Sequence, residues 1–325
     1  SAGSVSPPAS SPQAPADASW ERKTLERLAF AALEEQRTAR RWKVRIRLLW
    51  LALIAVLLWM AYREMPDSAS ISTPHTALIE IRGEIAADTE ASSQFLLGSL
   101  RSAFEDKGAK AVVLLINSPG GSPVQAGIIN DEITRLKALH NKKVYAVVEE
   151  TCASAAYYIA AAADNIYVDK ASLVGSIGVL MDGFGFTGLM DKLGVERRLM
   201  TAGANKAMLD PFSPQDAEQT AYIQSMLGEI HSQFITVVRA GRGERLKETP
   251  DTFSGLVWSG QKAIALGLVD GLGSLDYVAR EVIKAEEIVD YTRRENVGLR
   301  LAKRFGASMG EGMFLAARAA GVQLK

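Results

Sequence analysis

Residues 111–164 read AVVLLINSPGGSPVQAGIINDEITRLKALHNKKVYAVVEETCASAAYYIAAAAD, and in them short apolar runs rich in β-forming residues alternate with helix-like segments. The runs at 111–117 and 143–150 predict strands, and the segments at 124–139 and 154–163 predict helices. Strand and helix in alternation at this spacing favour right-handed crossovers and layered sheets. The stretch therefore predicts an α/β domain.

The same pattern extends outward on both sides. We expect further strands at 77–81 and 166–169, a helix at 92–105, and a long helix after Pro214 that ends near residue 238. The domain is predicted to occupy 77–285, preceded by a linker at 63–76. The remaining residues, 286–325, return to a charged and amphipathic character and are predicted to form a C-terminal tail.

Composition limits the classes of function. The chain has 325 residues, 48% of them hydrophobic, which is enough for one large core or one core with small attachments. Lys and Arg together number 37 and Asp and Glu number 37, so the balanced charge gives no reason to expect a nucleic-acid partner. Cys152 is the one cysteine, which excludes an intrachain disulfide. Cysteine usage therefore does not indicate whether the protein resides in an oxidising or a reducing compartment.

The N-terminal region differs from the domain in composition. Residues 1–19 consist largely of Ser, Ala, Pro and Gly and are predicted to be disordered, because they bury too little surface to offset the entropy of ordering. Residues 20–47 are predicted to be a helical segment. Its second half is strongly basic, with no acidic residue between 37 and 47.

Residues 48–62, LLWLALIAVLLWMAY, contain no charged residue. As a helix they span about 22 Å, which is short of a hydrocarbon core of about 30 Å. Arginine side chains at both ends can extend to the headgroups, and aromatic side chains suit the interfaces, so we expect a single transmembrane anchor in contact with the lipid bilayer. The residues concerned are Arg47 and Arg63, and Trp50, Trp59 and Tyr62.

Two alternatives to an anchor are a buried core helix and a cleaved signal peptide. Basic flanks are poor core material, and the region before 48–62 is long with no convincing A-x-A site after it. The basic cluster before the anchor predicts a cytoplasmic N-terminus. In a bacterium the expected location is therefore the inner membrane, with the α/β domain in the periplasm or otherwise outside the cytoplasm.

The sequence Asn117-Ser-Pro-Gly-Gly121 follows directly on the apolar strand predicted at 111–117. A Pro-Gly-Gly turn at a strand end exposes backbone N–H groups that no side chain shields, which suits an anion or oxyanion site. The alternative is an ordinary tight turn that leads into a helix.

Ser154 stands where the strand at 143–150 gives way to an Ala-rich helix. Its Oγ would lie at the positive end of that helix, where a developing alkoxide or oxyanion is favoured. The same position also describes a plain N-cap serine. Cys152, two residues away, is a rival nucleophile, although a small buried cysteine is the commoner role.

A serine nucleophile needs a base, and the chain offers few histidines. His75 lies in the linker, His140 at a helix end and His231 in a helix with a polar face, and none has a convincing active-site setting. Ser-Lys pairs solve the same chemical problem. Lys206, in AGANKAM, is a candidate, but a solvated loop lysine is the commoner interpretation, and periodicity does not choose one lysine among many.

Five motifs in a fixed order give the chain a resemblance to peptidase family S49, in the short form of signal peptide peptidase A with one catalytic domain. They span about 77–282 and are INSPGG (116–121), CASAAYYIAAAAD (152–164), SLVGSIGV (172–179), AGANKAMLDPFSP (202–214) and VWSGQKAIALGLVDGLG (257–273). The resemblance implies a Clp/crotonase-like spiral of ββα units and a Ser-Lys dyad.

Residue by residue, the resemblance assigns the nucleophile to Ser154 and the general base to Lys206. It gives Ser176 the role of orienting the lysine amine, Gly121 that of an oxyanion donor, and the amide of Ala155 an assisting role. Lys206 has to be neutral to accept a proton, so we expect a dry pocket around its amine without a nearby carboxylate. The sequence departs from the family at Ala155-Ala156, where Gly-Gly is usual, and at Asn205 and Ala207, where Tyr and Ser are common.

The resemblance also implies partners. The expected substrates are remnant signal peptides and other hydrophobic unfolded peptides, and a homo-oligomer is expected. No cofactor or metal is expected, because the sequence has no His/Cys/Asp cluster with ligand spacing and no Walker pattern.

Two other classes of function remain open. The first is an enoyl-CoA hydratase-like enzyme on the same broad fold, for which Glu149 and Glu150 are the candidate acid/base residues, although a membrane anchor fits a soluble CoA substrate poorly. The second is a weak or inactive family member that serves as a membrane scaffold or binds a partner. The Ala155-Ala156 change favours this second alternative, and the presence of both Ser154 and Lys206 weighs against it.

Overall fold

The computed structural model describes residues 26–27, 41–56, 59 and 73–294. The chain divides into two compact units, Ser1–Ala69 and Ser70–Lys325. The predictions for 1–19 and for most of the linker and the C-terminal tail lie outside the described residues.

In the first unit, residues 41–56 form a helix whose large apolar side chains are exposed. Across the described residues, no helix is both long enough and apolar enough to span a bilayer. Part of the predicted anchor, at 57–58 and 60–62, lies outside the described part of the chain.

The second unit is built on a sheet whose described strands run in the order β6-β5-β3-β2-β1-β8, with β4 attached to β3 and β7 attached to β4. All strand pairs are parallel except β5 with β6. The strands are β1 His75–Arg82, β2 Ala109–Ser118, β3 Lys143–Ala153, β4 Asn165–Val168, β5 Leu173–Gly175, β6 Val257–Ser259, β7 Gly271–Leu272 and β8 Ile288–Asp290. The predicted α/β, sheet-based fold is confirmed.

The sheet forks along β3. The first half of β3 pairs with β4 at Tyr145–Val147, and its end pairs with β5 at Thr151–Ala153. Between them the register of β3 against β2 shifts. Ser154 therefore directly follows the end of β3, which lies between β2 on one side and β5 on the other.

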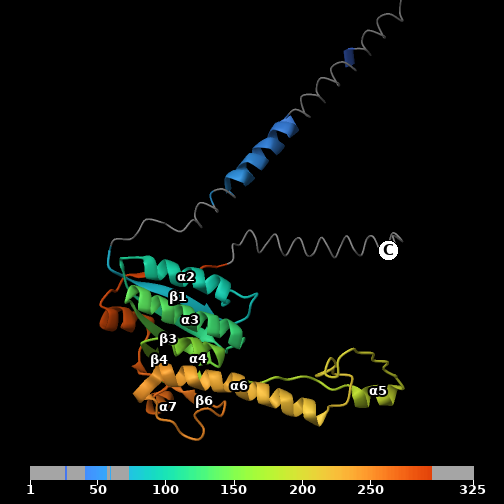
Figure 1. Ribbon diagram of the computed structural model, residues 1–325. Helices are drawn as coiled ribbons and strands as arrows, with labels where there is room; N and C mark the ends of the chain where they lie inside the picture. Colours follow the sequence, from blue (N-terminus) through green and yellow to red (C-terminus); the bar gives the residue numbers. More distant parts are fainter. Residues whose placement is uncertain (1–25, 28–40, 57–58, 60–72, 295–325) are drawn as a thin grey trace, which may run out of the picture. The chain divides into compact units, whose positions relative to one another are not determined.

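The described helices are α2 Ser93–Glu105, α3 Pro123–His140, α4 Ala155–Ala160, α5 Thr187–Leu193, α6 Ala217–Arg242, α7 Gly260–Ala265 and α8 Leu275–Tyr277, with a short 3-10 turn at Gly243–Arg245 and a π-helical turn at Val278–Ile283. Helices α2, α3, α4 and α6 contribute to the core on the sheet, whereas α5 lies away from the sheet (Figure 1). The helix predicted at 154–163 ends earlier, at Ala160, because the next amides bond three residues back: Ala163 N donates to Ala160 O at 3.0 Å. Ser122 caps α3 by accepting a hydrogen bond from Gln125 N.

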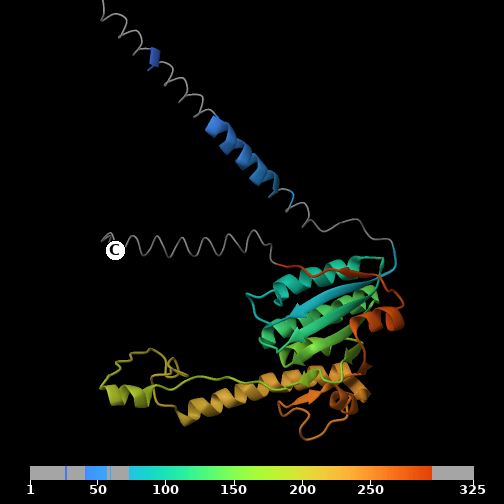
Figure 2. The ribbon, with the colours of Figure 1, turned by 180° about the vertical axis from the view of Figure 1, so that it is seen from behind.

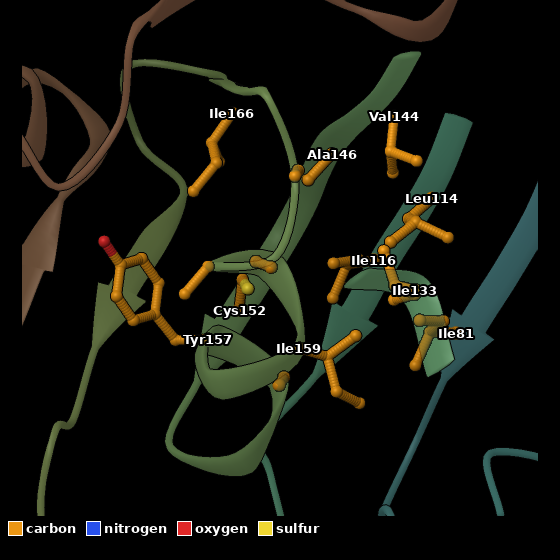
Figure 3. Packing of buried hydrophobic residues seen from close by; sticks show 14 of the residues in the cluster. Ile81, Leu114, Ile116, Ile133, Val144, Ala146, Cys152, Tyr157, Ile159 and Ile166 are labelled. Carbon is orange, nitrogen blue, oxygen red and sulfur yellow. The ribbon is translucent and has the colours of Figure 1, made fainter. Parts of the chain in front are cut away.

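The core has two parts, one on each face of the sheet. The larger part lies between the sheet and helices α2, α3, α4 and α6 and includes Val112, Leu114 and Ile116 of β2 (Figure 3). The smaller part includes Val113 and Leu115 of the same strand, packed near the π-helical turn. Burial on both faces explains why β2 is a continuous apolar run rather than an alternating one.

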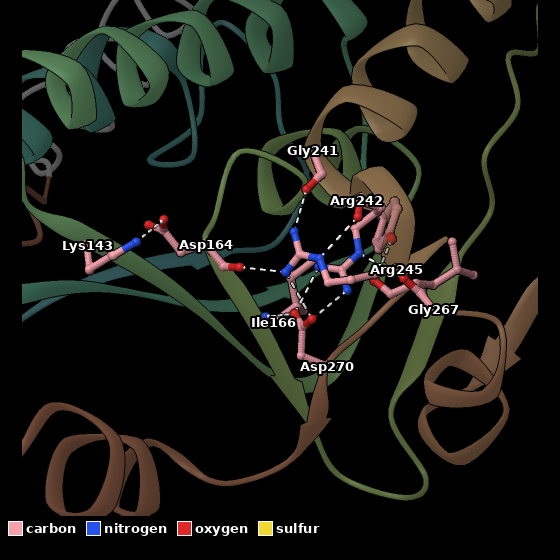
Figure 4. A network of polar contacts seen from close by, with 10 residues as sticks. Lys143, Asp164, Ile166, Gly241, Arg242, Arg245, Gly267 and Asp270 are labelled. Carbon is pink, nitrogen blue, oxygen red and sulfur yellow. Dashed lines mark hydrogen bonds and ion pairs between the residues drawn. The ribbon is translucent and has the colours of Figure 1, made fainter. Parts of the chain in front are cut away.

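A buried ion pair joins the end of α6 to the segment before β7 (Figure 4). The Arg242 side chain is fully buried and donates from Nη1 and Nη2 to the Asp270 carboxylate at 2.9 and 2.8 Å, and from Nε to Gly267 O. Arg245 adds a bond from Nη1 to Asp270 at 3.0 Å. Burial raises the pKa of Asp270, but the hydrogen bonds and charge of Arg242 outweigh it, and the pKa lies below its usual value.

Next to this ion pair, α6 approaches the turn after α4 closely. Gly241 is required there, because a Cβ on this residue would lie 2.0 Å from Ala161 O.

Arg242→Ala is expected to lower the free energy of unfolding by about 3 kcal/mol, because it leaves the carboxylate of Asp270 partly buried without its main partner. Urea unfolding of the full chain, followed by circular dichroism, measures the change. The matched control is Arg280→Ala, which breaks an exposed pair with Glu281 (2.9 Å) and should cost less than about 1 kcal/mol. Equal losses in the two variants would contradict a stabilising role for the buried pair.

Candidate active site

Ser154 has a strained backbone at the junction of β3 and α4. Its φ and ψ are 52° and −124°, a conformation that non-glycine residues seldom adopt. Its N–H donates to Gly175 O at 2.8 Å, and its carbonyl accepts from Tyr158 N at 3.0 Å, which starts the helix. Its side chain makes no capping hydrogen bond, so the N-cap interpretation does not account for the serine. Strain of this kind costs about 1–3 kcal/mol and clusters at functional sites.

The Pro-Gly-Gly turn lies directly against Ser154. A Cβ on Gly120 would lie 2.8 Å from Ser154 Cβ and 3.0 Å from Ala155 N, so this approach requires glycine. The turn is fixed by two bonds to Ile85: Ile85 N donates to Gly120 O at 2.8 Å, and Ser122 N donates to Ile85 O at 2.7 Å. Gly121 has φ 144°, and a Cβ there would lie 2.3 Å from Ile85 O.

Two backbone amides near the serine are free to bind an anion. In the part of the chain that the structure describes, the Gly121 N–H donates no hydrogen bond. The N–H of Ala155, the first residue of α4, has no partner within its own helix. A free amide at a glycine turn and another at a helix start, on either side of a serine, match the requirements of an oxyanion site.

Ser176 lies close to Ser154, because each follows the end of one of the paired strands β5 and β3. It follows Gly175, whose carbonyl accepts the Ser154 N–H, and its own N–H donates to Leu256 O at 2.8 Å. Its φ is 50°, so the turn around it is a second strained point. The indole of Trp258 covers Gly175, since a Cβ on that glycine would lie 3.0 Å from Trp258 Cδ1. The structure therefore brings together Ser154, Ser176, Gly121 and Ala155.

Lys206 lies elsewhere in the same chain. It is exposed in a turn between α5 and α6, on a segment at 180–216 that we call the arm. The arm is carried at the outer end of α6, away from α4 (Figures 1 and 2). Asn205 Oδ1 accepts from Gln219 Nε2 at 3.2 Å in the first turns of α6, whereas Phe234 of the same helix contacts Tyr158, one turn after Ser154.

The separation of Lys206 from Ser154 follows from the length of α6. Gln219 and Phe234 are fifteen residues apart, which is about 22 Å along a helix. A single chain therefore does not form the Ser-Lys contact, and the dry pocket expected around the amine is not present around Lys206 in one chain. The structure places the predicted base on the arm and the other predicted site residues on the sheet.

The arm is ordered internally and apolar externally. Phe186 stacks on Phe212 with centroids 5.4 Å apart, Arg197 lies over the same Phe212 ring, and Phe186 N donates to Pro211 O. Other large apolar side chains of the arm are exposed, including Leu180, Phe184, Leu193, Met200 and Leu209. An apolar surface of this extent is characteristic of a contact with another molecule.

The alternative site residues have other roles in the structure. Cys152 is fully buried, and burial raises the pKa of its thiol, which removes it as a nucleophile. His75 is buried between Thr73 O and the Tyr291 hydroxyl, and Glu149 pairs with Arg82 at 2.6 Å. No cluster of His, Cys, Asp and Glu that could hold a metal ion occurs among the described residues.

His231 is nearer to the site than the sequence indicated. We expected it on a polar helix face, but its Nε2 lies 3.1 Å from Ile177 O, beside Ser176. Hydrophobic spacing alone did not reveal this contact, because a single histidine does not disturb an amphipathic pattern.

A strained serine at a strand end, with free amides on both sides, is typical of serine hydrolases on α/β folds. The model of Peptidase family S49 matches residues 137–289 of the chain.

Three relatives illustrate the similarity. The Na(+)/H(+) antiporter NhaA of Brucella melitensis is 51% identical over 178 residues, which are 55% of this chain and 24% of that protein. The "Putative protease" of Methanocaldococcus jannaschii is 34% identical over 215 residues (64% of this chain, 68% of that protein). The "Putative signal peptide peptidase SppA" of Enterococcus faecium is 31% identical over 217 residues (64% and 63%).

The chain belongs to peptidase family S49, as its motifs predict. The chain spans about a quarter of the length of the two Brucella relatives named Na(+)/H(+) antiporter NhaA. About three quarters of each of these proteins lie outside the match, so their name is not transferred to this chain.

Proposed function

We propose that the protein is a serine endopeptidase in which Ser154 is the nucleophile and Lys206 the general base. The observation that carries the proposal is the strained Ser154 between the free amides of Gly121 and Ala155. Family membership supports peptide bonds as the target. Parallel pairing of β1, β2 and β3 under helices supports the Clp/crotonase-like spiral expected for the domain.

The reaction proceeds by acyl transfer. The Lys206 amine takes the proton of Ser154 Oγ as this oxygen attacks the carbonyl carbon of the substrate, and the Gly121 and Ala155 amides hold the resulting oxyanion. The lysine then gives the proton to the leaving amine, and the C–N bond breaks. Water, deprotonated by the same amine, attacks the carbonyl carbon of the acyl-serine. The lysine returns this proton to Ser154 Oγ as the C–O bond breaks, which releases the second peptide.

We propose further that the dyad forms between two copies of the chain. The separation of about 22 Å along α6 prevents contact between Lys206 and Ser154 of one chain while the arm keeps its position. An arm with exposed apolar side chains suits a neighbouring copy, on which it would be buried together with Lys206. Such burial supplies the dry setting that a neutral amine requires.

The proposed substrates are remnant signal peptides and other hydrophobic, unfolded peptides. We propose that residues 48–62 anchor the chain in the bacterial inner membrane, with the N-terminus cytoplasmic and the catalytic domain on the opposite side. The charge-free sequence and the exposed apolar side chains of the helix at 41–56 support a bilayer contact. A membrane-bound site is close to peptides released within the membrane.

A weak or inactive scaffold is the second candidate. The exposed position of Lys206 and the Ala155-Ala156 pair favour it. A scaffold would keep the arm as a contact surface without assembling the dyad.

Covalent labelling separates the two candidates. A fluorophosphonate probe should modify the full chain at Ser154, because an activated serine attacks phosphorus while the thiol of Cys152 stays buried. Peptide mapping by mass spectrometry locates the adduct, and Ser154→Ala should abolish it. Absence of labelling in the wild-type assembly would favour the scaffold.

A further inference from the structure

The inward face of α6 carries two polar side chains, the buried Arg242 at its C-terminal end and His231 nearer its middle, where the neighbouring buried residues are apolar. Ile223, Phe234 and Val238 are buried on this face at helical spacing. His231 lies three residues before Phe234, on the same face, and is half-buried. A polar group in this position is costly unless it is hydrogen-bonded.

The hydrogen bond of His231 goes to the turn that holds Ser176. Its Nε2 lies 3.1 Å from Ile177 O. A carbonyl oxygen only accepts, so Nε2 carries the proton and donates. Ile177 is itself fully buried in the main core.

The turn at 175–178 is held from several sides. Ser154 N donates to Gly175 O at 2.8 Å, and Ser176 N donates to Leu256 O at 2.8 Å. Gly178 passes close to Gly255, since a Cβ on Gly178 would lie 3.2 Å from the Gly255 Cα. Among the hydrogen bonds that the described residues make to this turn, the bond from His231 is the one made by a side chain, so it can be removed without altering the backbone.

We propose that His231 is a positioning residue, which fixes the Ser176–Ile177 turn and so directs the Ser176 hydroxyl toward the lysine amine. The positive φ of Ser176 is a strained conformation that persists only when its surroundings hold it. His231 supplies one of these restraints from α6, the helix that also carries the arm. The proposal rests on the proposed function, because Ser176 acts only if Lys206 is the base.

The test compares His231→Leu with His231→Gln in the full-length assembly. Gln places an N–H donor where His has Nε2, whereas Leu keeps a similar volume and leaves the Ile177 carbonyl without a donor. We expect His231→Leu to lower kcat for an apolar peptide by about tenfold or more with KM nearly unchanged, since small misplacements of catalytic groups cost up to about 100-fold. His231→Gln should stay within about threefold of the wild type.

Val238→Ala is the control for loss of stability, because it makes a cavity under the same helix, about two helical turns after His231. It should lower the Tm but not kcat. Equal kcat values for the Leu and Gln variants, or a loss in Val238→Ala as large as in His231→Leu, would overturn the proposal.

Amide hydrogen exchange of residues 173–180 tests the positioning independently of activity. Exchange should be faster in His231→Leu and unchanged in His231→Gln and Val238→Ala, and unchanged exchange in His231→Leu would overturn the proposal. Fluorophosphonate labelling of wild-type Ser154 is measured in the same samples. Absence of that labelling counts against the proposed function and, with it, against the positioning role of His231. Normal labelling together with wild-type kcat and exchange in His231→Leu counts against the positioning role alone.

Discussion

Lys206→Ala is expected to lower peptidase activity by about a thousandfold or more while the fold stays intact. Without a neutral amine, no other proposed site residue in the described part of the chain is assigned to accept the Ser154 proton, and loss of one member of a nucleophile–base unit costs nearly as much as loss of the whole unit. Because Lys206 is exposed in the single chain, its removal should not change the free energy of unfolding by more than about 0.5 kcal/mol. Turnover of an apolar peptide and circular dichroism measure the two quantities.

The matched control is Lys192→Ala. Lys192 lies in the last turn of α5, on the same arm, and is also exposed. The Lys192→Ala variant should keep most of the activity. The comparison therefore distinguishes the loss of the base from a general loss of positive charge on the arm. Retained turnover in Lys206→Ala would remove Lys206 from the mechanism.

Mixing two inactive variants should restore activity if the dyad forms between copies. Ser154→Ala keeps its own Lys206, and Lys206→Ala keeps its own Ser154. In a mixed assembly some arms with an intact lysine will meet a neighbour with an intact serine. With equal amounts, each partner of a site is intact with a probability of about one half, so about a quarter of the wild-type activity is expected.

The experiment requires co-expression with two different affinity tags, so that mixed assemblies are purified and compared with each variant alone. Each variant alone should be inactive to the limit of detection. Mixed assemblies without activity would show that serine and lysine come from one chain, which would require the arm to fold back onto its own sheet.

The longer elements could be predicted from the sequence because burial leaves a hydrophobic pattern along them that is long enough to recognise, a continuous apolar run in β2 and spaced apolar residues in α3. The β2 run and the amphipathic α3 were predicted within a few residues of their observed bounds. The strands β5 to β8 were not predicted, because they have two or three residues each, which is too short for alternation to appear. Their pairing is set by tertiary contacts, such as the antiparallel contact of β5 with β6.

The site was predictable to different degrees. Ser154 and Gly121 follow strand ends, and parallel strands bring their carboxyl ends to one edge, so position in the sequence pointed to both. Lys206 and Ser176 had no local signal and were assigned through the resemblance to the family. The separation of Lys206 from Ser154 was not predictable, because the motif order contains no information on the direction of the arm.

The most direct test is the distance between Ser154 Oγ and Lys206 Nζ in an experimental structure of the full-length assembly. We predict that the lysine amine of one copy lies about 2.6–3.2 Å from the serine hydroxyl of its neighbour, and that the arm shields both from solvent. An assembly in which every Lys206 amine remains exposed to water, far from any Ser154, would contradict the proposed dyad.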